Sequence, residues 1–169
     1  MNTVINILIC GIGGQGVVFI SNLLSNTISK SGYDIKESEI HGMAKRGGQV
    51  YSQIRFGKKV FSPIIADHSL NFLLDLDGNE YINYTEKTNK STIIIKVKNN
   101  NIQLNNLLEV DINKFMDLYN IDKKNINMFL LGILVKNINE FLKFNNLLLD
   151  NVNFPNALSK KAFEIGFNL

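Results

Sequence analysis

Six residues near the amino end of the chain carry a glycine motif that could bind an anion. The motif, which we refer to as the glycine loop, comprises Gly11, Ile12, Gly13, Gly14, Gln15 and Gly16. Glycines let the backbone turn tightly and approach a ligand, and the free N–H groups at the start of a following helix favour negative charge. An acid about twenty residues further on, Glu37 or Glu39, could hold a ribose hydroxyl. One interpretation is therefore a dinucleotide site.

Two features weaken the dinucleotide interpretation and favour a structural role for the glycine loop. The same glycines are needed to pack a helix closely against the strand before it. The second crossover helix of a dinucleotide-binding fold is also missing from the pattern that follows. The residues alone leave both interpretations open.

A second candidate segment, the Arg-Gly-Gly loop, spans residues 41–48. Its candidate residues are His41, Gly42, Arg46, Gly47 and Gly48. Arg46 is informative because the chain has only two arginines among its 18 basic residues, and its planar fork of donors suits a carboxylate or phosphate as lysine cannot. The loop also lies in a stretch, between Asn26 and Asn71, that contains none of the 25 asparagines. We interpret it as an anion clamp or a docking contact; the alternative is an exposed turn.

Three further residues could take part in chemistry, but none has a suitable partner nearby in the sequence. His41 could act as an acid or base, since imidazole titrates near neutrality, and a hydrogen-bonded histidine within the loop is the alternative. His68 stands at the start of an expected strand and is interpreted as structural. Cys10 ends a buried strand, where a small thiol packs well. Nothing in the sequence therefore assembles a complete active site, and we name no catalytic residue on this chain.

Composition excludes several classes of protein. The single cysteine excludes a disulfide framework, a self-contained iron–sulfur cluster and a cysteine-based zinc site, so no metal site is expected and a reducing, cytoplasmic setting is the default. The net charge of +3 is too mild to indicate binding to nucleic acid or a membrane surface. Residues 1–29 are uncharged, but they lack a basic leader and are interrupted by glycines, which favours a buried strand and helix over a targeting segment.

The glycine loop requires a strand before it and a helix after it, and the sequence supplies both. Residues 4–10 are apolar and rich in β-branched side chains, as is typical of a buried strand. Apolar residues then recur at helical spacing from Val17 until Gly32, which supplies a stop. Residues 33–39 form a second expected strand. A crossover of this kind places both strands in one parallel sheet.

Beyond the Arg-Gly-Gly loop the pattern changes from a plain doubly wound fold. Residues 50–56 alternate as a strand does, and Gly57, Lys58 and Lys59 predict a turn into an antiparallel hairpin with residues 60–65. Further strands are expected at 70–76 and 93–97, with a helical turn at 78–84 and helices at 114–119, 125–138 and 155–166. The sum is an α/β fold: one Rossmann-like, three-layer domain over residues 1–169, with a parallel sheet core and an antiparallel hairpin extension.

These motifs together resemble the gamma subunit or domain of 2-oxoacid:ferredoxin oxidoreductases. The likeness rests on the glycine loop, on residues 38–48, which include the motif His-Gly-Met-Ala-Lys-Arg-Gly-Gly at 41–48, and on residues 50–57 and 62–65. That motif is most similar to the beta subunit of indolepyruvate:ferredoxin oxidoreductase. A weaker likeness extends over nearly the whole chain.

The resemblance implies a role that the residues alone do not reach. In this family a thiamine diphosphate enzyme decarboxylates a 2-oxoacid, passes electrons through iron–sulfur clusters to ferredoxin, and transfers the acyl group to coenzyme A. Thiamine diphosphate and the clusters belong to a large partner subunit, and no cofactor is implied on this chain. By the same resemblance, the glycine loop and the Arg-Gly-Gly loop would face that partner, near the route by which coenzyme A enters.

Several functions stay open at this point. The substrate of the complex could be an arylpyruvate such as indolepyruvate, or pyruvate or a branched-chain 2-oxoacid. The chain could also be a free-standing NAD(P)-binding protein that uses the glycine loop, or an assembly or regulatory module. Substrate contacts are expected on the partner, so this chain does not choose among the 2-oxoacids.

Overall fold

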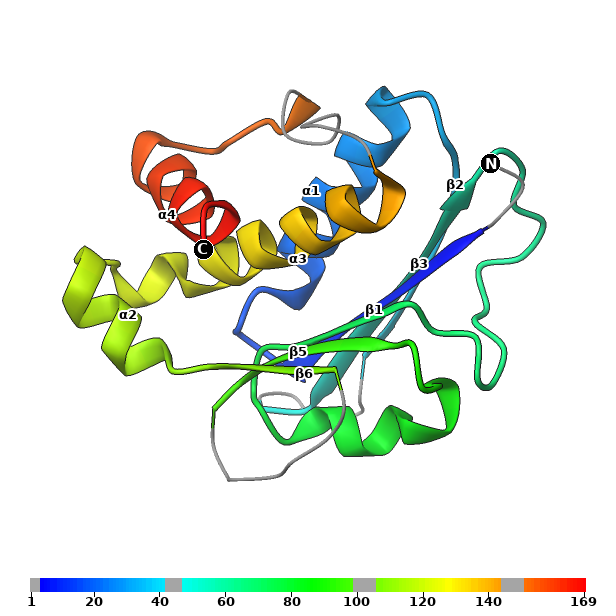
Figure 1. Cartoon of the computed structure of the whole chain (residues 1–169), viewed down its shortest axis with the longest axis horizontal. Helices are drawn as coiled ribbons and strands as arrows, with labels where there is room; N and C mark the ends of the chain where they lie inside the picture. The colour runs from blue at the N-terminus through cyan, green and yellow to red at the C-terminus, as the bar shows by residue number, and fades with distance from the viewer. Residues whose placement is uncertain (1–3, 42–46, 99–105, 144–150) are drawn as a thin grey trace.

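A six-stranded mixed sheet forms the centre of the molecule (Figure 1). The computed structural model describes residues 4–41, 47–98, 106–143 and 151–169, and for His41 the backbone alone. The strands are β1 (Ile5–Ile12), β2 (Asp34–His41), β3 (Gln49–Gly57), β4 (Phe72–Asp75), β5 (Ile93–Val97) and β6 (Leu107–Val110). The helices are α1 (Val17–Lys30), α2 (Ile112–Tyr119), α3 (Ile126–Leu142) and α4 (Ala157–Phe167), with 3-10 helices η1 (Glu80–Lys87) and η2 (Lys123–Asn125).

The sheet has a parallel half and an antiparallel half. Its strand order is β2-β3-β1-β4-β5-β6. The strands β1, β4, β5 and β6 run parallel, whereas β3 pairs antiparallel with both β1 and β2. The α/β fold with a parallel core and an antiparallel extension is therefore confirmed.

Helices of unequal weight cover the two faces of the sheet, so the fold has the expected three layers. On one face α1, α3 and α4 pack over a large apolar core that includes Ile20, Phe72 and Phe129 (Figure 1). On the other face η1 covers a smaller core around Leu73 and Tyr81. Strand β1 is buried on both faces, which explains its continuous apolar sequence.

The first crossover follows the sequence pattern. The four apolar residues that predicted α1, namely Val17, Ile20, Leu24 and Ile28, are all buried in the large core. The helix ends at Ser31, and Gly32 has a φ of +85°, which a residue without a Cβ adopts at little cost. Strands β1 and β2 share a sheet and a direction, as expected, but β3 lies between them.

The hairpin forms with a different partner from the one predicted. We expected β3 to pair with residues 60–65, but β3 pairs with β2 on one edge and β1 on the other. Because both edges of β3 are already hydrogen-bonded, residues 60–65 find no free edge and form a loop without strand structure. The antiparallel extension is thus the β2–β3 hairpin, and the segment that connects its strands contains the Arg-Gly-Gly loop.

The remaining predicted elements are present with shifted ends. The expected helices correspond to α2, α3 and α4, the expected helical turn to η1, and the two expected strands to β4 and β5. Strand β6 was not predicted. It has only four residues, and asparagines precede it, so its apolar pattern is too short to stand out from a turn.

Candidate functional site

The two loops singled out in the sequence meet at the carboxyl end of β1. The backbone N–H of Gly13 donates a hydrogen bond to the carbonyl oxygen of Gly48, with an N···O distance of 2.9 Å. A Cβ on Gly13 would lie 3.5 Å from that same oxygen. The junction forms because the antiparallel pairing sets Ile12 opposite Gln49, so that the glycine loop at the end of β1 lies beside the end of the Arg-Gly-Gly loop at the start of β3. The described parts of the two loops therefore form one surface.

Only part of the Arg-Gly-Gly loop can be placed. Gly42 and Arg46 lie outside the described residues, as does the side chain of His41, and their expected roles stay predictions. Gly47 has a φ of +73°, a left-handed conformation that a residue without a Cβ adopts at little cost.

Gln15 closes the glycine loop from inside. Its Oε1 accepts the N–H of Ile12 at 2.7 Å, and its Nε2 donates to Oδ1 of Asp77 at 3.4 Å. A Cβ on Gly11 would lie 2.5 Å from this Oε1, so the glycine at position 11 leaves room for the glutamine. Gln15 and Gly11 therefore serve the shape of the loop.

Gly16 joins the loop to α1 and contacts α3. It is the N-cap of α1 with a φ of +87°, and no side chain caps the helix there. A Cβ at this position would overlap Nδ2 of Asn127, which lies at the start of α3. Gly14, by contrast, has a φ of +100° and open space where its Cβ would be. The loop thus rests on α3 at Gly16 and opens to solvent at Gly14.

A cavity of about 480 Å³ lies beside the exposed side of the glycine loop. Gly14, Gln15 and Asn127 contribute polar groups to it, and Leu76 and Leu130 contribute an apolar wall. Lys123 and Lys124 of η2 also line it. Asp122 lines the cavity as well, so the lining has an apolar wall, two basic residues and one acidic residue, and this net positive charge suits an organic molecule that carries negative charge. The lysines were not singled out in the sequence, because two adjacent lysines are common on solvated surfaces.

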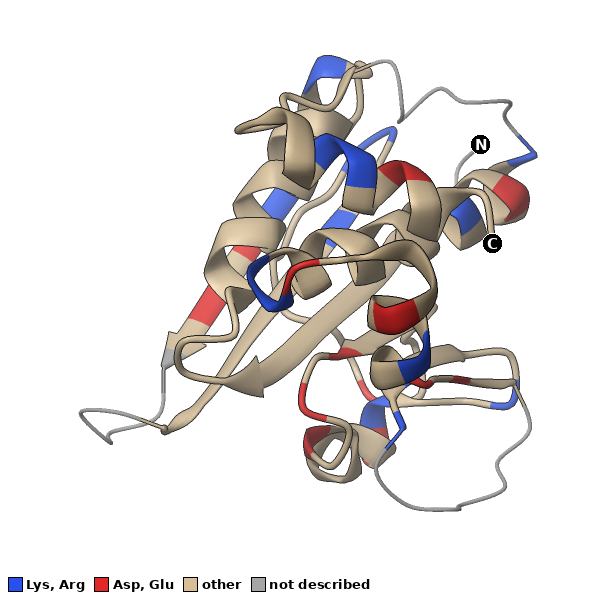
Figure 2. Ribbon diagram, turned by 90° about the vertical axis from the view of Figure 1, so that its left-hand side faces the viewer, with Lys and Arg blue, Asp and Glu red and all other residues tan. Residues whose placement is uncertain are grey.

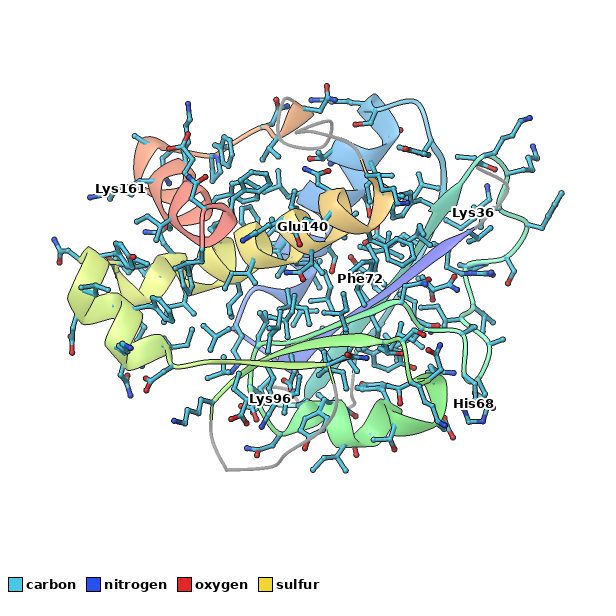
Figure 3. All side chains as sticks on the ribbon, in the orientation of Figure 1. Lys36, His68, Phe72, Lys96, Glu140 and Lys161 are labelled. Atoms are coloured by element: carbon cyan, nitrogen blue, oxygen red, sulfur yellow. The ribbon has the colours of Figure 1, made fainter. Side chains whose placement is uncertain are left out.

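A row of four side chains, three of them buried and Glu109 partly exposed, supports the glycine loop from within the sheet. Cys10, Asp75, Lys96 and Glu109 are cross-strand partners in register on β1, β4, β5 and β6, so they point to one face of the sheet. Lys96 is 1% exposed and forms an ion pair of 3.0 Å with Glu109 (Figure 3). Its Nζ also lies 5.1 Å from the ring centre of Tyr81, a cation–π geometry. The row was missed in the sequence, although one lysine within the apolar run 93–97 was a signal.

Asp75 connects this row to the loop. Its carboxylate accepts N–H bonds from Asp77, Gly78 and Tyr81, each at 2.9 Å. Burial raises the pKa of this carboxyl, and the three N–H donors oppose that rise. Because Asp77 in turn contacts Gln15, the buried row holds the turn that braces the glycine loop.

Cys10 has the environment of a structural thiol. It is fully buried and free. Burial raises the pKa of the thiol well above its ordinary value, and the charges of Asp75, Glu80 and Asp77 raise it further. A nucleophilic or redox cysteine needs an exposed, electropositive setting, so the packing interpretation of Cys10 is supported.

His68 is tied by hydrogen bonds to the end of η1, which supports its structural interpretation. Its backbone N–H donates to the carbonyl of Glu86 at 3.0 Å, and its Nδ1 lies 3.2 Å from the carbonyl oxygen of Thr88. Its φ of +55° is uncommon for a residue with a Cβ.

The two acids considered for a ribose are poorly placed for one. They lie on β2, which β3 separates from β1, so they are about one strand spacing, ~4.8 Å, further from the glycine loop than in a dinucleotide fold. Glu37 accepts a hydrogen bond from Ser52 at 3.2 Å, and Glu39 from Asn22 at 3.3 Å. The geometry therefore favours the packing interpretation of the glycine loop over a dinucleotide held by these acids.

The described residues contain neither a metal-ligand cluster nor a membrane-spanning helix. No group of three or more His, Cys, Asp or Glu side chains there is placed to hold a metal ion. Within the same residues, no helix is long and apolar enough to cross a bilayer. Acidic and basic residues are interspersed over the ribbon in Figure 2, in keeping with the mild net charge of +3.

The fold is an open α/β domain in which the glycine loop and the Arg-Gly-Gly loop meet at the carboxyl end of β1. The chain belongs to the pyruvate ferredoxin/flavodoxin oxidoreductase family, whose pattern it matches over residues 6–168.

Curated relatives match part of the chain. It is 38% identical over 85 residues to the indolepyruvate oxidoreductase subunit IorB of Pyrococcus horikoshii, covering 48% of this chain and 42% of that protein. The IorB of Archaeoglobus fulgidus is 33% identical over 91 residues, covering 54% and 45%. The matches thus span less than half the length of these relatives.

Solved structures share the fold over nearly the whole chain. The pyruvate oxidoreductase subunit PORC of Thermotoga maritima aligns with a TM-score of 0.68 at 16% identity, covering 98% of this chain and 96% of that one. The 2-oxoglutarate:ferredoxin oxidoreductase of Magnetococcus marinus, solved with 2-oxoglutarate, coenzyme A and succinyl-CoA bound, aligns with a TM-score of 0.70 at 13% identity. The match covers 99% of this chain but 31% of that one, so there the fold is part of a longer polypeptide.

Proposed function

We propose that this chain, as one domain over residues 1–169, is the small subunit of a 2-oxoacid:ferredoxin oxidoreductase of the indolepyruvate type. The complex would oxidatively decarboxylate an arylpyruvate to an acyl-CoA and reduce ferredoxin. The observation that carries the proposal is the family match over residues 6–168. The identities of 33–38% to proteins named IorB favour indolepyruvate over other 2-oxoacids.

The chain's residues support a division of labour with a large subunit. An iron–sulfur cluster needs several cysteine ligands and this chain has one, which is fully buried, so the clusters would belong to the partner. Thiamine diphosphate would belong there as well and supplies the decarboxylation chemistry when bound. The single free cysteine also favours a reducing, cytoplasmic location.

The glycine loop and the Arg-Gly-Gly loop would supply the partner-facing surface. Their junction between Gly13 and Gly48 holds two backbone segments together without long side chains, and such a surface lets another backbone approach closely. The buried row behind the loop would keep this surface rigid. In this role neither loop needs a catalytic residue.

Coenzyme A is an anionic cofactor of the proposed complex, and this chain offers basic residues that suit its phosphates. Its phosphates are anionic, and Lys123 and Lys124 line the cavity of about 480 Å³ beside Gly14. The open space at Gly14 would let a ligand approach the backbone. We infer that these residues would attract and orient the anionic part of coenzyme A, while bond making and breaking occur on the partner.

The test is co-expression with the cognate large subunit. We expect the two chains to co-purify and to reduce an artificial electron acceptor when given indolepyruvate and coenzyme A. Activity with pyruvate or a branched-chain 2-oxoacid should be lower. A preference for either would keep the family role but change the substrate.

Other outcomes would replace the proposal. If the chains do not co-purify and the large subunit is fully active alone, the chain is not a required subunit. If the isolated chain instead binds NAD(P) tightly and saturably, the dinucleotide alternative is correct. If the chain co-purifies but turnover is unchanged without it, an assembly or regulatory role is correct.

A further inference from the structure

Residues 60–65 expose two large apolar side chains at the far end of the sheet from the glycine loop. Phe61 is 88% exposed and Ile64 is 63% exposed. The residues that bracket them, Val60 and Ile65, are 2% and 0% exposed. The segment therefore has buried anchors at both ends, and the two exposed side chains are not the result of a poorly packed loop.

Arg55 fixes the backbone of this segment. Its Nη1 donates to the carbonyl oxygens of Ser62 and Ile64, at 2.8 and 3.0 Å, and its Nε donates to Oδ1 of Asn6 at 2.8 Å. One of the two arginines of the chain is thus used to hold two carbonyls of a surface loop. Pro63 restricts the backbone between them.

Three further side chains complete the support. Oδ2 of Asp34 accepts the N–H of Val60 at 2.8 Å, and Oε1 of Gln53 accepts the N–H of Ile65 at 2.8 Å. Nζ of Lys87 donates to the carbonyl of Ile65 at 3.1 Å. A loop held in this way loses little conformational entropy when it binds, and pre-organised aromatic anchors are typical of interface hot spots.

Basic residues surround the base of the segment. Lys58 and Lys59 precede it and are exposed, and Lys36 is exposed on β2 directly opposite Arg55 (Figure 3). The Val60 N–H bond, with Lys36 and Lys59, holds the pKa of Asp34 below its ordinary value, so this carboxylate stays ionised inside the basic group. The complementary surface is an apolar pocket with an acidic rim.

A second copy of this chain fits the segment poorly. A two-fold contact would set the same lysines of both copies against each other, and like charges at close range are unfavourable. A longer partner is in keeping with the relatives, because in the Magnetococcus marinus enzyme this fold is 31% of one polypeptide.

We propose that residues 60–65 are a pre-formed docking loop, in which Phe61 and Ile64 insert into an apolar pocket with an acidic rim on the large subunit. This inference rests on the proposed function. It adds a second contact at the end of the sheet opposite the joined loops, so the large subunit would hold the domain at both ends of β1.

The experiment titrates the full chain into the purified large subunit and compares two exposed apolar residues of equal exposure. Ile64→Ser tests the docking loop, and Leu158→Ser is the matched control, because Leu158 is also 63% exposed but lies on α4. We expect Ile64→Ser and Phe61→Ser to weaken binding about tenfold or more, and Leu158→Ser to change it less than about twofold. Thermal unfolding of the isolated variants should match wild type, since the replaced side chains are exposed.

Two further variants separate the parts of the argument. Arg55→Lys keeps the charge but loses the planar guanidinium, whose Nη1 holds the carbonyls of Ser62 and Ile64 while its Nε holds Asn6, so it should weaken binding and speed amide exchange at Ile65. Replacing Lys58 and Lys59 with glutamate should slow association and reduce its salt dependence.

Each result decides the matter. If wild type binds the large subunit and Phe61→Ser binds equally well, the docking loop is wrong while the proposed function stands. If wild type does not bind the large subunit, both fail together. Phe61-dependent self-association, or Phe61-dependent binding to vesicles of anionic phospholipid, with large-subunit affinity unchanged, would overturn the inference in favour of those occupants.

Discussion

The N–H of Gly13 and the carbonyl oxygen of Gly48 lie 2.9 Å apart and join the two loops that carry the family likeness. They are 35 positions apart in the sequence (48 minus 13). They meet because β3 pairs antiparallel with β1, so the residues just before β3 lie beside the residues just after β1. A ligand or partner that contacts one loop therefore contacts a surface shared by both.

Gly16→Ala should destabilise the fold more than Gly32→Ala. Both glycines have nearly the same φ, +87° and +85°, so an added Cβ costs each about 1–2 kcal/mol of backbone strain. At Gly16 the Cβ would also overlap Asn127, whereas at Gly32 it meets nothing within 4 Å. We expect Gly16→Ala to lose ~1–3 kcal/mol more in the free energy of unfolding, measured with urea.

A second substitution checks the cause of that difference. Asn127→Ala removes the amide that the Cβ would overlap, so in the double variant the extra loss at position 16 should largely disappear. Equal losses for Gly16→Ala and Gly32→Ala would show that α3 yields to the added Cβ without cost.

Arg46→Lys tests the anion clamp expected of the Arg-Gly-Gly loop. The substitution keeps the charge and removes the planar fork of donors. Affinity for the large subunit, or turnover, should therefore fall about tenfold, which is the usual order of effect when a bidentate arginine contact is lost. Thermal unfolding of the isolated chain should not change. Lys45→Arg, at the neighbouring position, is the control and should leave both quantities near wild type. Wild-type assembly and turnover in Arg46→Lys would remove Arg46 from the site.

Local sequence patterns predicted where helices and strands form better than they predicted which strands pair in the sheet. The helical spacing of Val17, Ile20 and Leu24 is a property of one segment, and α1 formed where it indicated. The partner of β3 depends instead on which edge is free, and β1 and β2 compete with residues 60–65 for it. Turn residues such as Gly57 permit a reversal but do not choose the partner, so the hairpin was assigned wrongly.

The candidate site was predictable to the same extent. Glycines at positions 11, 13 and 16 predicted a loop whose backbone lies close to other groups. In the structure those groups are Gln15, Gly48 and Asn127, respectively. The row of Asp75, Lys96 and Glu109 could not be assembled from the sequence, because its members are brought together only by the register of three parallel strands.

Stability should fall at alkaline pH because of Cys10. Burial raises the pKa of the folded thiol well above the ordinary value of 9.0, so below that value the thiol is protonated in both the folded and the unfolded chain. Above it, only the unfolded chain ionises, and the free energy of unfolding should decrease by up to about 1.4 kcal/mol per pH unit. Cys10→Ala lacks this titration, so the difference between the two urea-unfolding profiles isolates it.

Reaction with a thiol reagent gives an independent measure of the same burial. Native Cys10 should react with a disulfide reagent at pH 8 only as fast as the chain opens, and rapidly once urea unfolds it. Fast reaction of the folded chain would mean an accessible thiolate and would reopen a redox role.

Replacing Lys123 and Lys124 with glutamine should raise the KM of the assembled complex for coenzyme A. Lys123 and Lys124 line the cavity beside Gly14 together with Asp122, so replacing both lysines removes the net positive charge that attracts phosphate while changing the side-chain size little. We expect KM for coenzyme A to rise about threefold to tenfold, with kcat and KM for the 2-oxoacid near wild type. The reason is that the lysines would bind coenzyme A equally in the ground state and the transition state, so their loss weakens binding without slowing the reaction. The matched control is Lys90→Gln, which replaces an exposed lysine in the turn before β5 and should leave kcat and both KM values near wild type. A KM for coenzyme A unchanged in the double variant would assign the cavity to protein contacts and leave coenzyme A to the large subunit.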